Sequence, residues 1–160
     1  MHLAQINVGR LVAPSSDPRV AEFMNALDRV NGLGKRMPGF VWMMEGSGGP
    51  NTGNTDSVIG GDPRFISNLT VWDSVEALER FVWATVHRQF YERRAEWFEV
   101  LGRMHFAMWW VPAGHRPTLA EGLDRLAHLE ANGDSDRAFG WRHLPQARLW
   151  RTRPCARGAA

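Results

Sequence analysis

The sequence predicts an α+β fold: the ferredoxin-like split βαβ arrangement, in which four antiparallel strands carry helices on one face. Two observations predict it. Short segments alternate polar and apolar residues, and longer segments between them place apolar residues at helical spacing. The order is strand, helix, strand, strand, helix, strand, followed by one added helix. With 160 residues, 44% of them hydrophobic, the chain is long enough for a single compact domain with its own core.

The chain begins with a strand and a helix. Residues 2–12 alternate, and they place the polar Gln5 and Asn7 opposite a face of small apolar side chains. That mixed face indicates either an exposed sheet surface or the wall of a cavity. An Asp-Pro pair at residues 17–18 begins the helix, because the carboxylate can cap free amides and proline needs no donor there. The helical stripe that follows is apolar except for Asn31.

Two more strands and a long connection come next. Residues 40–44 form a short apolar strand, and residues 64–72 alternate again, with Asn68 on the mixed face. Between them, residues 45–63 are rich in Gly, Asn, Ser and Thr, which cannot pack a core of their own. This connection is either a long surface loop or a lid over a pocket.

The longest helical pattern covers residues 73–101. Asp73 and Glu76 form a capping box at its start, since each side chain can bind the backbone amide of the other residue. Two β-branched residues just before His87 weaken the helix. We therefore expect a bend or a break there, followed by a second helical segment over residues 88–101.

A closing strand and the added helix complete the domain. Residues 105–111 form the strand, which Pro112 ends. Thr118 and Glu121 form a second capping box, and leucines at helical spacing follow it. Residues 139–143 have the pattern of a short final strand.

The end of the chain differs in charge from the rest. Residues 145–160 hold four arginines and no acidic residue. Since the formal charge of the whole chain is +2, the remainder carries −2. We therefore predict a domain over residues 1–144 and a basic, disordered tail over residues 145–160, with no nucleic acid as partner.

Several classes of protein lack support in this sequence. No apolar run is long enough to span a bilayer and no signal pattern begins the chain, so we expect a cytoplasmic protein without a membrane partner. The single cysteine, Cys155, excludes an intrachain disulfide. There is no phosphate-binding loop, GxGxxG, HExxH or GxSxG motif. This leaves cofactor-free chemistry, haem or no catalysis.

The second sheet face has no predicted helix to cover it. A symmetric homodimer is the simplest cover for such a face. Two sheets that face each other would enclose a cavity in each half, and the polar residues of the mixed faces would then line it.

Three segments resemble a known family: LAQINVGRL, SNLTVWDSVEALERFVWATVHRQFYERRAEWF and MWWVPAGHRPTLAEGLDRLAHLEANG. They resemble a bacterial family known mainly as a domain of unknown function. That family is similar to the dimeric α+β barrel superfamily, which includes antibiotic-biosynthesis monooxygenases. The resemblance implies this barrel and a homodimer. Monooxygenases, polyketide cyclases, haem-degrading enzymes and haem-dependent dehydratases share the barrel, so fold alone does not fix the function.

Three residues are the candidates for catalysis. His87 could act as acid or base, because its ordinary pKa lies near neutrality. The resemblance also implies the alternative of a haem axial ligand at His87, and a third interpretation is a histidine that only binds backbone. Asn7 and Asn68 lie on the mixed faces of two strands, where their amides could orient a carbonyl or stabilise an enolate-like oxygen.

Other residues are candidates for substrate binding. Arg94 is two helical turns from His87 and could anchor an anion, or it could pair with a neighbouring acid. Five aromatic residues could line a pocket for a planar ligand, or could be core. They are Trp72, Trp83, Tyr91, Trp97 and Trp109.

The leading prediction is an enzyme that acts on a hydrophobic, ring-containing small molecule within the barrel. The reaction would be acid–base chemistry, such as cyclisation or isomerisation, or cofactor-free oxygenation, with no cofactor required. One alternative is a haem enzyme with His87 as axial ligand. The other is a non-catalytic ligand-binding module that uses the same pocket.

Overall fold

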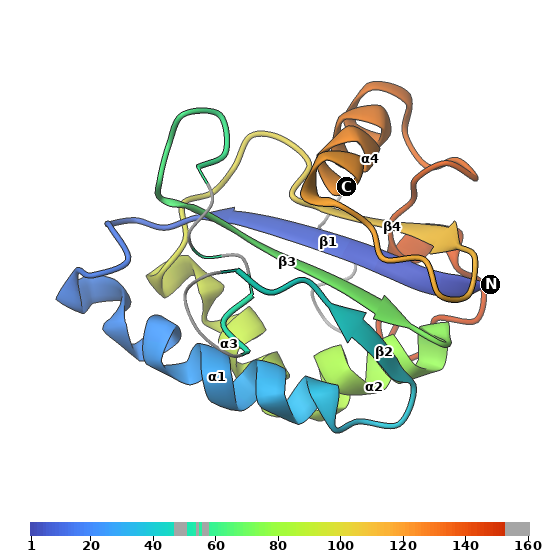
Figure 1. Cartoon of the computed structure of the whole chain (residues 1–160), viewed down its shortest axis with the longest axis horizontal. Coiled ribbons are helices and arrows are strands. Elements are labelled where there is room, and N and C mark those ends of the chain that lie inside the picture. Colours follow the sequence, from blue (N-terminus) through green and yellow to red (C-terminus); the bar gives the residue numbers. More distant parts are fainter. Residues whose placement is uncertain (47–50, 54, 56–57, 153–160) are drawn as a thin grey trace.

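Four strands form one antiparallel sheet in the order β2-β3-β1-β4. The computed structural model describes residues 1–46, 51–53, 55 and 58–152. The strands are β1 (His2–Arg10), β2 (Phe40–Met43), β3 (Phe65–Trp72) and β4 (Phe106–Val111). Two helices connect them in split βαβ order (Figure 1), which confirms the predicted fold class. No helix in the described part of the chain is long and apolar enough to cross a membrane.

The central strand β1 pairs with β3 on one side and β4 on the other. In this register Asn7 lies directly between Asn68 and Phe106. Residues that face each other across antiparallel strands point to the same side of the sheet. Asn7 and Asn68 therefore share one face, as the alternation in the sequence predicts.

Helices α1 and α2 cover that face of the sheet. The helices of the chain are α1 (Ala21–Lys35), α2 (Val75–Ala84), α3 (His87–Glu92) and α4 (Leu119–Asn132), with short 3-10 turns at Pro18–Val20, Arg94–Glu96 and Trp141–His143. Leu3 of β1 and Trp72 of β3 are buried there with Leu78 and Phe81 of α2. The amphipathic spacing of α2 makes this contact, because its apolar stripe meets the apolar end of the sheet face.

Helix α4 lies on the opposite face of the sheet (Figure 1). Its Leu126 and Leu129 are buried with Ile6 of β1 and Trp109 of β4. Gly122 permits this approach, since a Cβ there would lie 2.6 Å from Ile6 Cδ1. The two connecting helices thus lie on one face, as predicted, and the added helix, to which the sequence assigned no face, lies on the other. The sequence assigned the mixed face, with Gln5, Asn7 and Asn68, to a second copy, but α1 and α2 cover that face and α4 covers the apolar one. The homodimer stays a prediction.

The helical pattern breaks just before His87, as predicted. Helix α2 ends at Ala84, and Thr85 is extended. The Thr85 hydroxyl donates to the Phe81 carbonyl (2.6 Å) and accepts from the His87 backbone N–H (3.2 Å). A β-branched residue that satisfies the backbone through its own side chain is a physical reason for the break.

Two details of this region differ from the prediction. Ser74, not Asp73, caps α2, because its hydroxyl accepts from the Ala77 backbone N–H at 3.3 Å. The second helical segment ends at Glu92 rather than near residue 101. The chain instead runs beside the end of β1, where Val12 donates its N–H to the Trp97 carbonyl at 2.9 Å.

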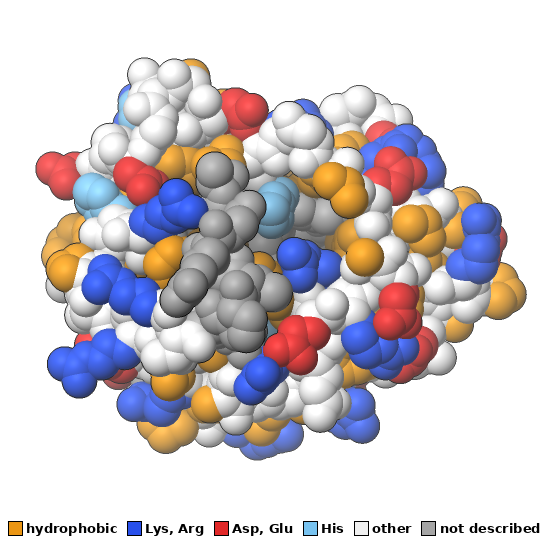
Figure 2. All heavy atoms as spheres, turned by 180° about the vertical axis from the view of Figure 1, so that it is seen from behind, with side chains coloured by type: hydrophobic (Ala, Val, Ile, Leu, Met, Phe, Trp, Pro, Cys, Tyr) orange, Lys and Arg blue, Asp and Glu red, His pale blue; other side chains and the backbone are white. Residues whose placement is uncertain are grey.

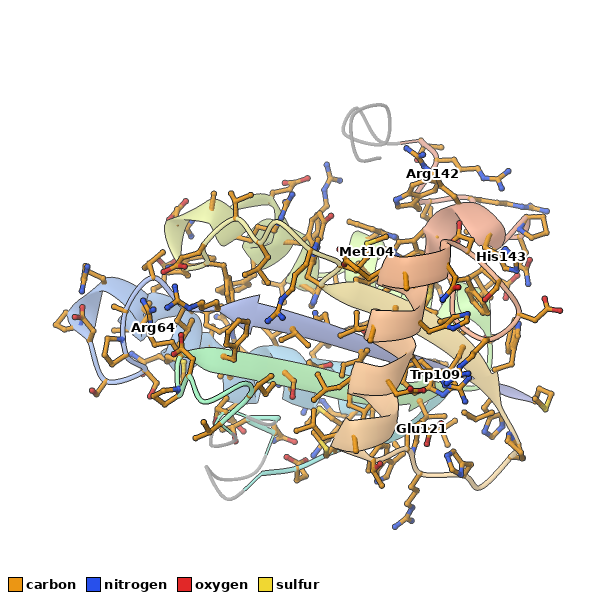
Figure 3. All side chains as sticks on the ribbon, turned by 90° about the horizontal axis from the view of Figure 1, so that it is seen from above. Arg64, Met104, Trp109, Glu121, Arg142 and His143 are labelled. Atoms are coloured by element: carbon orange, nitrogen blue, oxygen red, sulfur yellow. The ribbon has the colours of Figure 1, made fainter. Side chains whose placement is uncertain are left out.

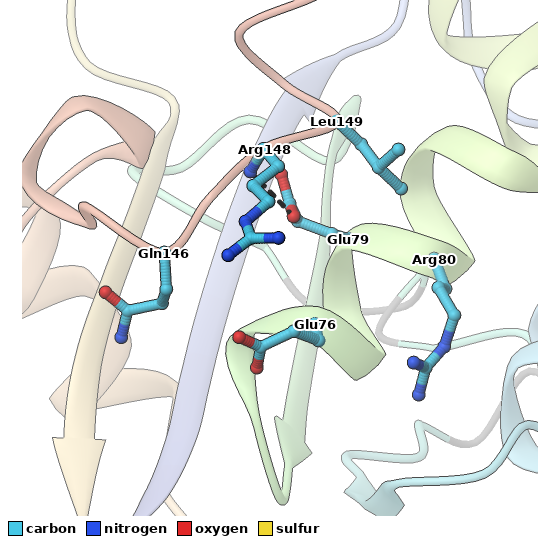
Figure 4. A pocket seen from close by; sticks show the side chains of 6 residues that line it. All are labelled: Glu76, Glu79, Arg80, Gln146, Arg148 and Leu149. Carbon is cyan, nitrogen blue, oxygen red and sulfur yellow. Dashed lines mark hydrogen bonds between the residues drawn. The ribbon is translucent and has the colours of Figure 1, made fainter.

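The C-terminal segment packs on α2 as far as Trp150, and Figure 4 shows part of this contact. The buried Glu79 carboxylate accepts backbone N–H bonds from Arg148 and Trp150, both at 3.0 Å. Ala147 is fully buried. The predicted tail boundary at residue 144 is therefore too early, because a carboxylate on α2 pairs with backbone amides that composition does not reveal. Residues 153–160, and part of the 45–63 connection, lie outside the described residues.

Gly39 directly precedes β2 and provides a test of how the start of β2 packs against α2. It has φ of 90°, and a Cβ there would lie 2.5 Å from Asp73 Oδ1 and would overlap the side chain of Ala77. We expect Gly39→Ala to lower the free energy of unfolding by about 3 kcal/mol, through backbone strain and overpacking together. Urea unfolding followed by far-UV circular dichroism measures it.

Gly133→Ala is the matched control. Gly133 has φ of 74°, but a Cβ there meets nothing within 4 Å. We expect Gly133→Ala to lower the free energy of unfolding by about 1 kcal/mol, because it adds backbone strain alone. Equal losses in the two variants would contradict the packing described here.

Candidate functional site

A set of hydrogen-bonded polar side chains lies on the helix-covered face of the sheet. Gln5 Nε2 donates to Thr70 Oγ1 (2.8 Å) and to Asn68 Oδ1 (3.2 Å). Asn68 Nδ2 donates to Asn31 Oδ1 of α1 at 3.4 Å. Gln5, Thr70 and Asn31 are buried, and a buried polar group is stable only with such partners. This amide set links β1, β3 and α1.

The amide set reaches solvent at Asn7. Gln5 is only 6% exposed, whereas Asn7, two residues along the same face of the same central strand, is exposed. A side chain on a strand with neighbours on both sides and helices above it is exposed only where the helices leave a gap. We name this gap the Asn7 opening.

Phe98 closes one end of the Asn7 opening. Gly9 follows Asn7 on the same face, and a Cβ at Gly9 would lie 2.5 Å from two atoms of the Phe98 ring. Only glycine allows an aromatic ring to rest on the backbone of a strand in this way. The opening is therefore bounded along β1 by Phe98 on one side and by Gln5 on the other.

Aromatic side chains extend from the sheet to α3 beside the opening. Phe106, opposite Asn7 on β4, stacks on Trp141 with ring centroids 5.8 Å apart. Trp141 contacts Trp83 (6.1 Å), and Trp83 contacts Tyr91 edge to face (4.9 Å). We call these four residues the aromatic wall. It could bind the face or edge of a planar ligand.

Arg94 covers the outer end of the aromatic wall. Its guanidinium lies over the Tyr91 ring at 4.4 Å and donates from Nη1 to the Tyr91 carbonyl at 2.9 Å. The side chain is exposed. The sequence placed Arg94 on the same helical face as His87, but α3 ends at Glu92 and a 3-10 turn carries Arg94, so that helical phase does not hold.

His87 points inward and is neutral at pH 7. Desolvation lowers its pKa from 6.5 to about 4, against a smaller opposing effect of a hydrogen bond with the Val82 backbone. Its Nδ1 is buried and has no hydrogen-bond partner among the described residues. The ring lies 4.8 Å from Phe81, which stacks on Trp72 at 5.3 Å. These two aromatic rings lie between His87 and the amide set.

The five aromatic residues predicted to form one pocket lie in different places. Trp83 and Tyr91 belong to the aromatic wall. Trp72 is core under α2, and Trp97 packs against Phe23 and Phe90. Trp109 is on the far face of the sheet, where its Nε1 donates to Glu121 Oε1 of α4 at 2.9 Å (Figure 3). The prediction of a single pocket was wrong, because strand alternation sends Trp109 to the other side.

Sequence reasoning missed four residues of the site: Asn31, Thr70, Phe106 and Trp141. Asn31 gave a signal, as the one polar residue in an apolar helical stripe. Thr70 follows Asn68 at strand spacing on the same face. The sequence contains no signal for Phe106 and Trp141, because their contact depends on how the segment after α4 returns to β4.

Two cavities lie elsewhere in the structure, and residues outside the amide set line them. One, of about 350 Å³, lies between α2 and the C-terminal segment and is lined by Glu76, Arg80, Gln146 and Arg148 among others (Figure 4). The other, of about 390 Å³, lies at the α2–α3 junction and includes Thr85 and Gln89. Asn7, Asn68 and His87 line neither. The described residues contain no group of three His, Cys, Asp or Glu side chains placed to hold a metal ion.

Comparison with known protein families assigns the chain to one of them. A family model described as a domain of unknown function, DUF3291, matches residues 2–155. The chain belongs to the DUF3291 family. This confirms the family resemblance predicted from the sequence. The match continues past residue 144, in agreement with a domain that includes the C-terminal segment packed on α2.

One solved structure resembles this DUF3291 domain. It is provisionally titled an antibiotic biosynthesis monooxygenase, from Chloroflexus aurantiacus J-10-fl. The identity is 19%, the TM-score is 0.43, and the alignment covers 73% of this chain and 98% of that chain. At these values nothing about function follows from the similarity. No curated protein matches the chain.

His87 gives this DUF3291 domain a specific pH dependence. Its pKa is about 4 in the folded state against 6.5 when unfolded, so the unfolded chain binds the proton more tightly. The stability that comes from a neutral His87 is present above pH 6.5 and is lost as the pH falls toward 4. We expect a loss of about 2 kcal/mol between pH 7 and pH 4.5.

His87→Gln removes this titration and serves as the control. Denaturant unfolding at a series of pH values should give a flatter stability profile for the variant than for the wild type. Parallel profiles would show that burial does not hold His87 neutral.

Proposed function

We propose that this DUF3291 domain binds a ring-containing small molecule at the Asn7 opening and acts on it. The observation that carries the proposal is the exposure of Asn7 on the helix-covered face of the central strand, directly above a buried amide set. A gap with a few fixed polar groups and apolar walls is the usual composition of a small-molecule site.

The polar and apolar parts of the opening have different roles. The Asn7 amide would orient an oxygen of the ligand. Asn68 would form the fixed polar floor beside it, since its N–H groups donate to Asn31 and Met43 and its carbonyl accepts from Gln5. The aromatic wall, at its Phe106 end, would bind the ring of the ligand. The arrangement suits a planar molecule with a carbonyl or hydroxyl at one edge.

Cofactor-free oxygenation with dioxygen is the reaction that these groups support best. It needs a donor that stabilises an enolate-like oxygen, for which Asn7 is the candidate, and apolar side chains around the ring, for which the aromatic wall is the candidate. Acid–base catalysis works best with a group whose pKa lies near the working pH. The pKa of about 4 makes His87 a weak base, and Phe81 and Trp72 lie between it and the amide set.

Haem ligation by His87 fits these residues poorly. A haem beside the imidazole would have to displace Phe81, whose ring contacts His87 and Trp72. Phe81 is also fixed from α1, since a Cβ at Gly34 would lie 3.0 Å from it.

Hemin titration tests this directly. We expect the Soret spectrum of added hemin to be the same with the wild type and with His87→Ala. A Soret shift that the wild type gives and His87→Ala does not would establish the ligand and replace the present proposal.

Binding of naphthol tests the proposed site. We expect it to quench tryptophan fluorescence, and Asn7→Ala to weaken its binding about fivefold, which is the loss of one hydrogen bond of about 1 kcal/mol. Because Asn7 is exposed, the substitution should leave stability within about 0.5 kcal/mol. Asn25→Ala, at an exposed position of α1, is the control and should bind like the wild type.

Two outcomes separate the alternatives. Equal binding by Asn7→Ala and the wild type would move the site away from the opening. Tight binding of oxygenated ring compounds with no product after prolonged aeration would favour a non-catalytic binding module.

A further inference from the structure

We infer that the ligand of the Asn7 opening carries an anionic group, which Arg94 receives at the outer end of the aromatic wall. This rests on the proposed function, because it adds a charge requirement to the same site. The ligand class is then a ring-containing acid, with its carboxylate toward Arg94 and its ring toward the aromatic wall.

The first observation is that Arg94 lacks an acidic partner where its neighbours have one. Arg88 pairs with Glu92 at 2.7 Å. Arg93 pairs with both Glu22 and Glu96, each at 2.7 Å. No carboxylate in the described part of the chain forms an ion pair with Arg94. On the face shown in Figure 2, basic and acidic side chains are interspersed, so local pairing and not a broad charged patch decides where an anion can bind.

The second observation is that Arg94 is held in place without being neutralised. The Tyr91 ring stacks on one face of its guanidinium, and the Tyr91 carbonyl accepts from Nη1. These contacts leave other N–H donors of the fork for a ligand. A planar guanidinium fixed on an aromatic ring is well suited to bind a carboxylate through two parallel hydrogen bonds.

The third observation connects Arg94 to the opening. Tyr91, under the guanidinium, is the outer member of the aromatic wall, whose inner member Phe106 lies opposite Asn7. A continuous row of ring contacts therefore joins Arg94 to the strand position opposite Asn7.

A matched pair of probes tests the inference. Naphthalene carboxylate and naphthalene carboxamide have the same ring and nearly the same shape, but only the first is charged at pH 7. We expect the wild type to bind the carboxylate about tenfold more tightly, as a charge-assisted pair implies. The preference should shrink in high salt, since Arg94 is exposed.

Two variants localise the effect. Arg94→Met keeps the length of the side chain and removes the charge, and it should bind carboxylate and carboxamide equally. Arg88→Met removes a guanidinium that is already paired with Glu92, and it should keep the preference of the wild type.

The outcomes distinguish this inference from the proposed function. Binding of both probes with equal affinity by the wild type, or an unchanged preference in Arg94→Met, would overturn the anionic requirement and leave the site in place. Binding of neither probe, together with no binding of naphthol, would overturn both.

Discussion

The hydrogen bonds of Gln5 are the interaction on which this structure depends. Gln5 is buried in the central strand, between a sheet and two helices, where an unpaired amide would be unfavourable by several kcal/mol. Its bonds to Thr70 and Asn68 satisfy it, and Asn68 in turn reaches Asn31 on α1. These bonds fix the register of β1 against β3 and the position of α1 above them, and they leave Asn7 as the point where the polar face reaches solvent.

The break at Thr85 determines what borders that point. Because α2 ends there, the chain turns, and α3 presents Tyr91 toward Trp83 while His87 faces inward. An unbroken helix would have carried these side chains away from the sheet. The aromatic wall, the neutral imidazole and the exposed Arg94 are thus consequences of one interrupted helix. The roles proposed for the amide set, which would hold a ligand oxygen, and for the aromatic wall, which would hold the ring, depend on this geometry.

The added helix α4 changes what the fold requires of a partner. A split βαβ sheet with one bare face would need a second subunit, but α4 buries Ile6 and Trp109 within the chain. The fold is shared by proteins of different chemistry, so it does not choose between catalysis and binding. In the proposed function, the local groups at the Asn7 opening make that choice, because their amide and aromatic side chains suit a planar, oxygen-bearing ligand.

The sequence by itself determined the four strands, the two connecting helices, the break before His87 and the shared face of Asn7 and Asn68, because alternation, helical spacing and β-branching are local properties. Only the tertiary structure decided that α4 covers the second face, that Trp109 lies apart from Trp83, and that Glu79 holds the C-terminal segment. It also decided that Phe106 and Trp141 stand beside Asn7. Each of these depends on contacts between segments far apart in the chain, and the pattern of one segment contains no information about which distant side chain will pack against it.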